Sequence, residues 1–69
     1  MEVQIKYRIK QIRIEKHLSL RQLEELSGVS NSFISAIENN KKHPTTITLC
    51  QLAIALDVNP EELFTYCVL

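Results

Sequence analysis

The segment LRQLEELSGVSNSFISAIEN, which covers residues 20–39, decides the fold of this 69-residue chain. Apolar residues recur in it every three or four positions, the spacing of one face of a helix, both before and after Gly28. Gly28 is the only glycine of the chain, and a glycine just beyond a helix end readily adopts the left-handed conformation that stops the helix. The segment therefore predicts two short helices that are joined by a tight turn and cross each other.

Both helices of this segment are preceded by capping residues. Ser19 is followed three residues later by Gln22, so each of the two side chains can bond the other residue's backbone N–H at the start of the first helix. Ser30 can cap the second helix, which we expect to run to about Asn39. The inward residues are predicted to be Leu23 and Leu26 in the first helix and Phe33, Ile34 and Ile37 in the second.

Another helix is predicted before this pair. Ile5, Ile9 and Ile12 share one face of a helix expected from Val3 to Lys16, with charged residues between them. No segment of the chain is predicted to be a strand.

Two further helices are predicted after the pair. Residues 39–44 form a loop by composition, and Thr45 or Thr46 starts a fourth helix beyond it. Its inward residues are predicted to be Leu49, Leu52, Ala53 and Leu56. Residues 59–62 supply an N-cap, a proline at the first helical position and two acids in the first turn, which predicts a short fifth helix. The expected architecture is all-α, a compact domain of five helices.

The length of the chain indicates one domain that spans residues 1–69, with a core from about residue 5 to residue 64 and an apolar tail at residues 65–69. So short a chain buries only a modest fraction of its surface, and a second subunit often adds stability. The apolar residues near the C-terminus exceed what a five-helix monomer needs to bury; they are Phe64, Tyr66, Val68 and Leu69. We therefore expect a homodimer.

Charge is balanced over the whole chain but unevenly distributed. Eight Lys and Arg residues are matched by eight Asp and Glu residues. Residues 1–21 contain six of the basic and two of the acidic residues, so this part carries a net charge of +4 and the remainder −4. A basic end can approach a phosphate backbone, although a solvated basic helix face explains the same pattern. Because the chain has no apolar run of ~18 residues and no secretory signal, we expect no membrane association and a cytoplasmic protein.

The sequence offers little for catalysis or for metal binding. Cys50 and Cys67 lack a CxxC spacing and are expected to be reduced thiols. His17 and His43 have no paired ligand spacing, so surface positions are expected for both and no metal or cofactor is predicted. The chain has no nucleophile with a matching base and no phosphate-binding loop, so we expect neither an enzyme nor a small-molecule ligand.

The sequence resembles the Xre-like helix-turn-helix regulators, the family of the lambda-type phage repressors and Cro. It resembles the SinR-type DNA-binding domain above all. The resemblance runs from about residue 5 to residue 64. It is carried by IKQIR at 9–13, EK at 15–16, LSL at 18–20, GVS at 28–30, SFISAIEN at 32–39, PT at 44–45 and LDVNPEEL at 56–63. It implies a lambda-repressor-like DNA-binding domain whose helix-turn-helix is formed by helices two and three.

The chain departs from the family's pattern at three positions. The family usually has glutamine where Leu20 stands, and the phosphate-binding role of that glutamine cannot be carried onto leucine. It usually has a small residue such as alanine where Glu24 stands. It often has glycine where Asn40 stands, and asparagine also tolerates the left-handed conformation.

The resemblance also implies which residues contact DNA, because the second helix of such a motif enters the major groove and reads bases near its N-terminus. The candidate base-reading residues are Ser30, Asn31, Ser32, Phe33, Ser35 and Ala36. Asn31 is the strongest candidate since its amide can bond adenine at two points, although a solvated first turn also explains Asn31 and Ser32. The candidate phosphate-binding residues are Arg21, Asn39, Lys41, Lys42, Thr45 and Thr46. A structural ion pair is implied between Arg13 and Glu38.

The function expected from the resemblance is sequence-specific binding of double-stranded DNA by a transcriptional regulator. We expect a repressor that binds a palindromic operator as a dimer. The alternative is a protein-interaction module, such as an antitoxin or an adaptor subunit with a regulatory protein partner. That alternative rests on the apolar C-terminal tail, and it overlaps with the first because antitoxins often bind DNA too.

Overall fold

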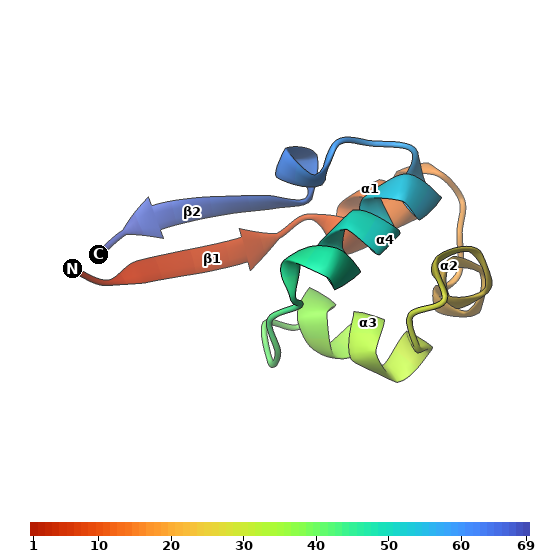
Figure 1. Cartoon of the computed structure of the whole chain (residues 1–69), viewed down its shortest axis with the longest axis horizontal. Coiled ribbons are helices and arrows are strands. Elements are labelled where there is room, and N and C mark those ends of the chain that lie inside the picture. Colours follow the sequence, from red (N-terminus) through yellow and green to blue (C-terminus); the bar gives the residue numbers. More distant parts are fainter.

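The computed structural model describes residues 1–69, which form four α-helices, one 3-10 turn and two strands. In chain order the elements are β1 (Val3–Tyr7), α1 (Ile9–Glu15), α2 (Leu20–Ser27), α3 (Asn31–Glu38), α4 (Thr46–Leu56), the 3-10 turn Pro60–Leu63 and β2 (Phe64–Val68). The four helices gather at one end of the molecule, and the two strands extend away from them as a ribbon with both termini at its far tip (Figure 1). We call this pair of strands, residues 3–7 and 64–68, the terminal ribbon.

The local signals at the helix-turn-helix act as predicted. The Gln22 backbone N–H donates to Ser19 Oγ over 3.0 Å, and the Ser19 N–H donates to Gln22 Oε1 over 2.8 Å, which completes the predicted capping box. Ser30 Oγ accepts from the Phe33 N–H at the start of α3. Gly28 ends α2 with φ of 77°, in the left-handed region. The predicted tight turn between the two helices is therefore confirmed.

The core lies where the inward faces of all four helices meet. Its buried apolar residues are Ile9, Leu23, Val29, Ile34, Ile37, Leu52, Ala53, Leu56 and Leu63. Leu26 was expected to face this core, but its side chain is 60% exposed because α2 turns that face toward solvent. None of the helices is long and apolar enough to cross a membrane.

The predicted all-α architecture of five helices is wrong at both ends of the chain. Residues 3–7, expected to begin the first helix, form a strand that pairs antiparallel with residues 64–68, and α1 begins only at Ile9. Both strands alternate apolar and polar residues and are rich in Val, Ile, Tyr, Phe and Thr, the residues that strands favour. The helical spacing of Ile5, Ile9 and Ile12 obscured this alternation.

The predicted fifth helix is a single 3-10 turn. Asn59, Pro60 and the two acids stand at the predicted positions of its first turn, and the Asn59 N–H donates to Glu62 Oε2 over 2.7 Å. Leu63 is fully buried, and its carbonyl accepts from the Arg8 N–H over 2.8 Å. Phe64 then adopts an extended conformation and enters β2. Pairing with β1 thus ends the helix after one turn.

The terminal ribbon has one apolar and one polar face, because residues that are directly paired in a sheet share a face. The pairs on the apolar face are Val3 with Val68, Ile5 with Tyr66 and Tyr7 with Phe64; those on the polar face are Gln4 with Cys67 and Lys6 with Thr65. Ile5, Tyr7 and Phe64 are half-buried, whereas Tyr66 and Val68 are 68% and 57% exposed. The end of the ribbon nearer the helices is therefore covered, and its far end is not.

Candidate nucleic-acid interface

One face of α3 is anchored in the core, and the opposite face is open to solvent. Ile34 and Ile37 are fully buried. Asn31 and Ser32 are exposed at the start of the helix, and Ser35 lies half-buried one turn later. A helix that presents short polar side chains outward can approach the floor of a major groove about 12 Å wide. The predicted base-reading face is thus available.

The strongest base-reading candidate has a protein partner. Asn31 Nδ2 donates to Glu24 Oε1 over 3.0 Å, and the Asn31 backbone N–H donates to Glu24 Oε2 over 3.2 Å. Our sequence reasoning noted Glu24 as a departure but gave it no role. The signal was present, because the family usually has a small residue at this position, where α2 packs closely against α3. A carboxylate placed there lies next to α3.

Other candidate base-reading residues have partners within α3 or beside it. Ser30 Oγ is occupied as the acceptor of the helix cap, although its hydroxyl can still donate. Phe33 is half-buried, and Lys42 Nζ lies 5.9 Å from the centre of its ring. Ala36 is also half-buried. Its methyl group can make an apolar contact with the methyl group of a thymine.

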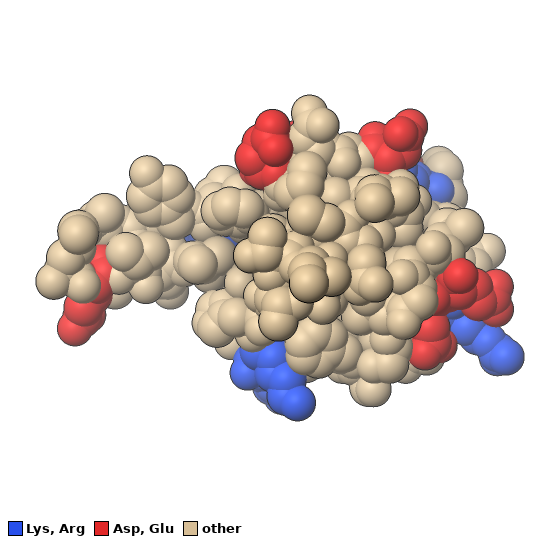
Figure 2. Space-filling model, in the orientation of Figure 1, with Lys and Arg blue, Asp and Glu red and all other residues tan.

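The candidate phosphate-binding residues fall mainly in the loop between α3 and α4. The Lys41 N–H donates to the Ala36 carbonyl over 2.8 Å, and Asn40 adopts φ of 58°, the left-handed conformation expected for it. This loop is thereby fixed to the end of α3. Lys41 and Lys42 are exposed, and basic side chains gather at the place of this loop, below the core in the view of Figure 2.

The remaining candidate phosphate-binding residues differ in their exposure and in the contacts that their side chains already make within the protein. Arg21 lies on α2, apart from the loop, with 84% of its side chain exposed and Glu25 Oε1 3.9 Å from its Nε. Asn39 Nδ2 donates to the Ser35 carbonyl over 2.9 Å. Thr45 Oγ1 caps α4 by accepting from the Thr48 N–H over 3.2 Å. Thr46 is exposed.

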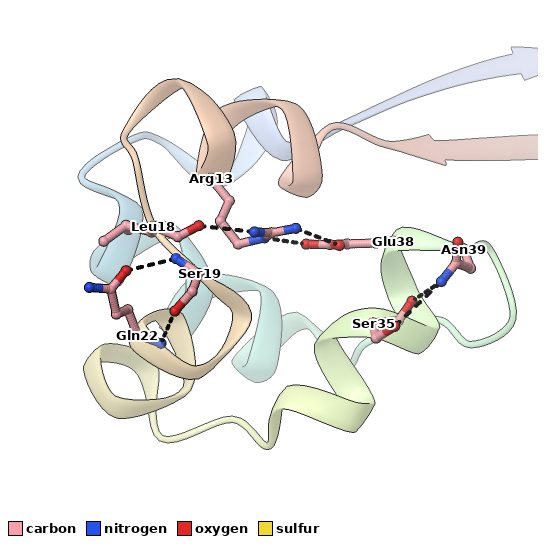
Figure 3. A network of polar contacts seen from close by, with 7 residues as sticks. All are labelled: Arg13, Leu18, Ser19, Gln22, Ser35, Glu38 and Asn39. Carbon is pink, nitrogen blue, oxygen red and sulfur yellow. Dashed lines mark hydrogen bonds and ion pairs between the residues drawn. The ribbon is translucent and has the colours of Figure 1, made fainter.

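Arg13 and Glu38 tie α1 to the end of α3 (Figure 3). Arg13 Nε lies 2.9 Å from Glu38 Oε2 and Nη2 lies 3.2 Å from Oε1, an arrangement that matches both carboxylate oxygens. Arg13 Nη1 also donates to the Leu18 carbonyl over 2.9 Å. The side chains of Arg13 and Glu38 are only 11% and 4% exposed. A nearly buried ion pair therefore joins α1 to the end of α3.

The sequence reasoning also missed a contact between the terminal ribbon and the loop before α4. Tyr7 Oη lies 2.8 Å from His43 Nδ1, and the two rings are 5.7 Å apart. Burial raises the pKa of Tyr7 above its ordinary value of 10.0. No group of three or more His, Cys, Asp and Glu side chains is placed to hold a metal ion, and both cysteines are free.

Comparison with known proteins identifies the family. Residues 9–63 match the family model described as helix-turn-helix. The chain belongs to the helix-turn-helix family. A curated relative, the HTH-type transcriptional regulator y4dJ of Sinorhizobium fredii, is 43% identical over 54 residues, which are 78% of this chain and 70% of the relative. The transcriptional regulator SinR of Bacillus subtilis is 43% identical over 53 residues, which are 75% of this chain and 48% of SinR.

Solved structures agree with the helix-turn-helix domain. SinR in complex with DNA is 42% identical and has a TM-score of 0.74, covering 78% of this chain and 87% of that chain. A putative DNA-binding protein from Bacteroides fragilis is 34% identical with a TM-score of 0.80, and covers 90% of this chain and 100% of that chain. The complex of SinR with SinI is also similar, with 41% identity and a TM-score of 0.75, over 80% of this chain and 54% of that chain.

Proposed function

We propose that this chain binds double-stranded DNA sequence-specifically as a transcriptional regulator, with α3 in the major groove. The observation that carries the proposal is the outward face of α3, which presents Asn31 and Ser32 while Ile34 and Ile37 hold the helix to the core. Further support comes from the likeness to SinR, whose structure was solved with DNA, and from relatives described as transcriptional regulators.

In this proposal the contacts divide into two kinds. Asn31 reads a base, assisted by Ser32, Ser35 and Ala36 along the same face, because hydrogen bonds and methyl contacts to base edges carry sequence information. The loop after α3 and Arg21 contact phosphates, which position the domain without specifying sequence. The exposed Lys41 and Lys42 supply the charge that displaces counterions from the duplex.

The experiment that tests this division starts from selection of bound sequences from random duplex DNA. Asn31→Ala should then lose about 1–3 kcal/mol on the selected site and relax the preference at one base pair. Lys41→Ala should weaken binding to the selected site and to a scrambled duplex alike, and should reduce the slope of log affinity against log salt by about one unit. If no sequence is enriched, the chain does not read bases through α3. If Asn31→Ala instead weakens both duplexes equally, Asn31 is not a base reader.

We also propose that the regulator acts as a two-fold dimer on a palindromic operator and represses transcription by covering a promoter. The terminal ribbon is the proposed dimer contact, and its occupant is a second copy of this chain. An isolated two-stranded ribbon is marginally stable in water, yet the far end of its apolar face carries Tyr66 and Val68 exposed, with Leu69 beside them. A second ribbon stacked on this face would cover these side chains.

The dimer is tested with two matched variants of adjacent ribbon residues. Tyr66→Glu places a charge on the apolar face of the ribbon, whereas Thr65→Glu places the same charge on the polar face; both positions are exposed. At tens of micromolar we expect sedimentation of a dimer for the wild type and for Thr65→Glu, and of a monomer for Tyr66→Glu. A wild-type monomer with and without DNA, or dimers for both variants, would refute this interface.

A second candidate function is binding to a regulatory protein. It is favoured by Ile47 and Ile54 on α4, which are 74% and 80% exposed, and by the nearly uncharged face over α4 in Figure 2. The likeness to the complex of SinR with SinI supports it as well. Binding of a selected DNA site by the purified chain alone distinguishes the regulator from a module that acts only through a partner.

A further inference from the structure

Glu24 makes contacts that the helix-turn-helix architecture does not require. Both of its carboxylate oxygens bond one residue of the next helix: Oε1 accepts from Asn31 Nδ2 over 3.0 Å and Oε2 accepts from the Asn31 N–H over 3.2 Å. Its neighbour Glu25 is exposed, and its Oε1 lies 3.9 Å from Arg21 Nε on the same helix. Of two adjacent acids on α2, one is therefore directed at the start of α3.

The chemistry of a carboxylate determines which way the Asn31 amide points. An ionised carboxylate only accepts hydrogen bonds, so the nitrogen end of the amide must face Glu24 and the carbonyl oxygen must face away. The amide nitrogen has two N–H donors, of which Glu24 takes one. One donor and the carbonyl oxygen remain, the pair that bonds the N7 acceptor and the N6 donor of adenine.

We propose that Glu24 is a positioning residue for base reading, which holds the Asn31 amide in the orientation that selects adenine before DNA arrives. This inference rests on the proposed function, since it assigns a partner to the proposed base reader. A side chain that is ordered in advance loses less conformational entropy on binding. It also cannot turn its amide over to present the opposite donor and acceptor order to another base.

The same carboxylate has an unfavourable effect on binding in general. A negative charge at the start of the reading helix repels phosphates whatever the sequence, and the repulsion weakens as salt rises. Glu24 should therefore lower affinity for every duplex while it sharpens the preference at one base pair. These two effects separate in variants, because removing Glu25 takes away the same charge without touching Asn31.

The test uses the full chain and the duplex selected above, with each of the four base pairs placed in turn at the position that Asn31→Ala relaxes. Affinities are measured for wild type, Glu24→Ala, Glu24→Gln, Asn31→Ala, the Glu24→Ala/Asn31→Ala double variant and the control Glu25→Ala. Melting temperatures of all six proteins are recorded as well, so that loss of folded protein is not mistaken for loss of preference.

We expect Glu24→Ala to reduce the preference for adenine by about tenfold, within the range for one two-point base contact. Glu24→Gln keeps an acceptor oxygen and should retain more of the preference. Glu25→Ala should leave the preference unchanged and raise affinity for all four duplexes alike, by about as much as Glu24→Ala raises it for the three duplexes without the preferred adenine pair. In the Asn31→Ala background, Glu24→Ala should change the preference no further.

Two results overturn the inference while the proposed function stands. One is a Glu24→Ala variant that selects adenine as strongly as the wild type does. The other is a Glu24→Ala effect of the same size with and without Asn31, because the effect would then bypass that residue. A wild-type protein that discriminates among no duplexes at all would overturn the proposed function and this inference together.

Discussion

The ion pair between Arg13 and Glu38 offers the sharpest prediction for stability. Glu38→Ala removes a carboxylate whose side chain is 4% exposed and leaves Arg13, which is 11% exposed, with the Leu18 carbonyl as its only remaining acceptor. Breaking a buried pair from one side typically costs about 3–5 kcal/mol, because the other charge stays buried without compensation. In a domain of this size, 1 kcal/mol corresponds to about 4–8 °C in melting temperature. We therefore expect Tm to fall by at least about 12 °C.

The assay is thermal and urea unfolding followed by circular dichroism, with Glu25→Ala as the matched control. Glu25 lies 3.9 Å from Arg21, and 70% of its side chain is exposed, so its removal should shift Tm by about 4 °C or less. Replacing both members of the buried pair by apolar residues, as in Arg13→Met/Glu38→Leu, should restore much of the lost stability. Equal melting temperatures for Glu38→Ala and Glu25→Ala would refute the assignment of the pair as a buried structural contact.

Three further predictions concern single residues. Gly28→Ala should destabilise the protein by about 1–2 kcal/mol, measured by urea unfolding, because φ is 77° there and an added Cβ meets no atom within 4 Å, which leaves backbone strain as the whole cost. Ser19→Ala removes the Oγ that accepts from the Gln22 N–H, and calorimetry should record a loss of about 1 kcal/mol. Burial raises the pKa of Tyr7 above 10.0, so as pH rises Tyr7 ionises in the unfolded chain before it ionises in the folded protein. The contribution of this pKa difference to folding stability is complete below about pH 10 and is lost as pH rises through the folded pKa. The melting temperature of the wild type should therefore fall relative to that of Tyr7→Phe as pH rises above about 10. A difference that stays constant with pH would contradict the burial effect.

The helix-turn-helix was predictable because its signals are local. The Ser19 and Gln22 capping box and the left-handed Gly28 each involve residues within one turn, so their hydrogen bonds and backbone angles follow from adjacent side chains. The same holds for the burial of Ile34 and Ile37, which the helical period places on one face.

The sequence supplied candidate residues for the site but not the contacts among them. The outward face of α3 follows from the helical period, whereas the bonds between Glu24 and Asn31 join two helices whose crossing depends on the packing of the core. A sequence pattern states that a carboxylate occurs on α2. It does not state which side chain of the next helix that carboxylate reaches.

By itself the sequence determined the helix-turn-helix, with its capped helices and its glycine turn, because these depend on interactions among residues close in the chain. Only the tertiary structure decided the secondary structure of the two ends of the chain. Residues 3–7 and 64–68 each satisfy a strand pattern, and residues 3–7 also satisfy a helical one. A strand needs a partner for its backbone N–H and C=O groups, and here that partner lies at the other end of the chain. The choice between helix and strand was therefore made by a contact across the whole length of the protein, which no local pattern records.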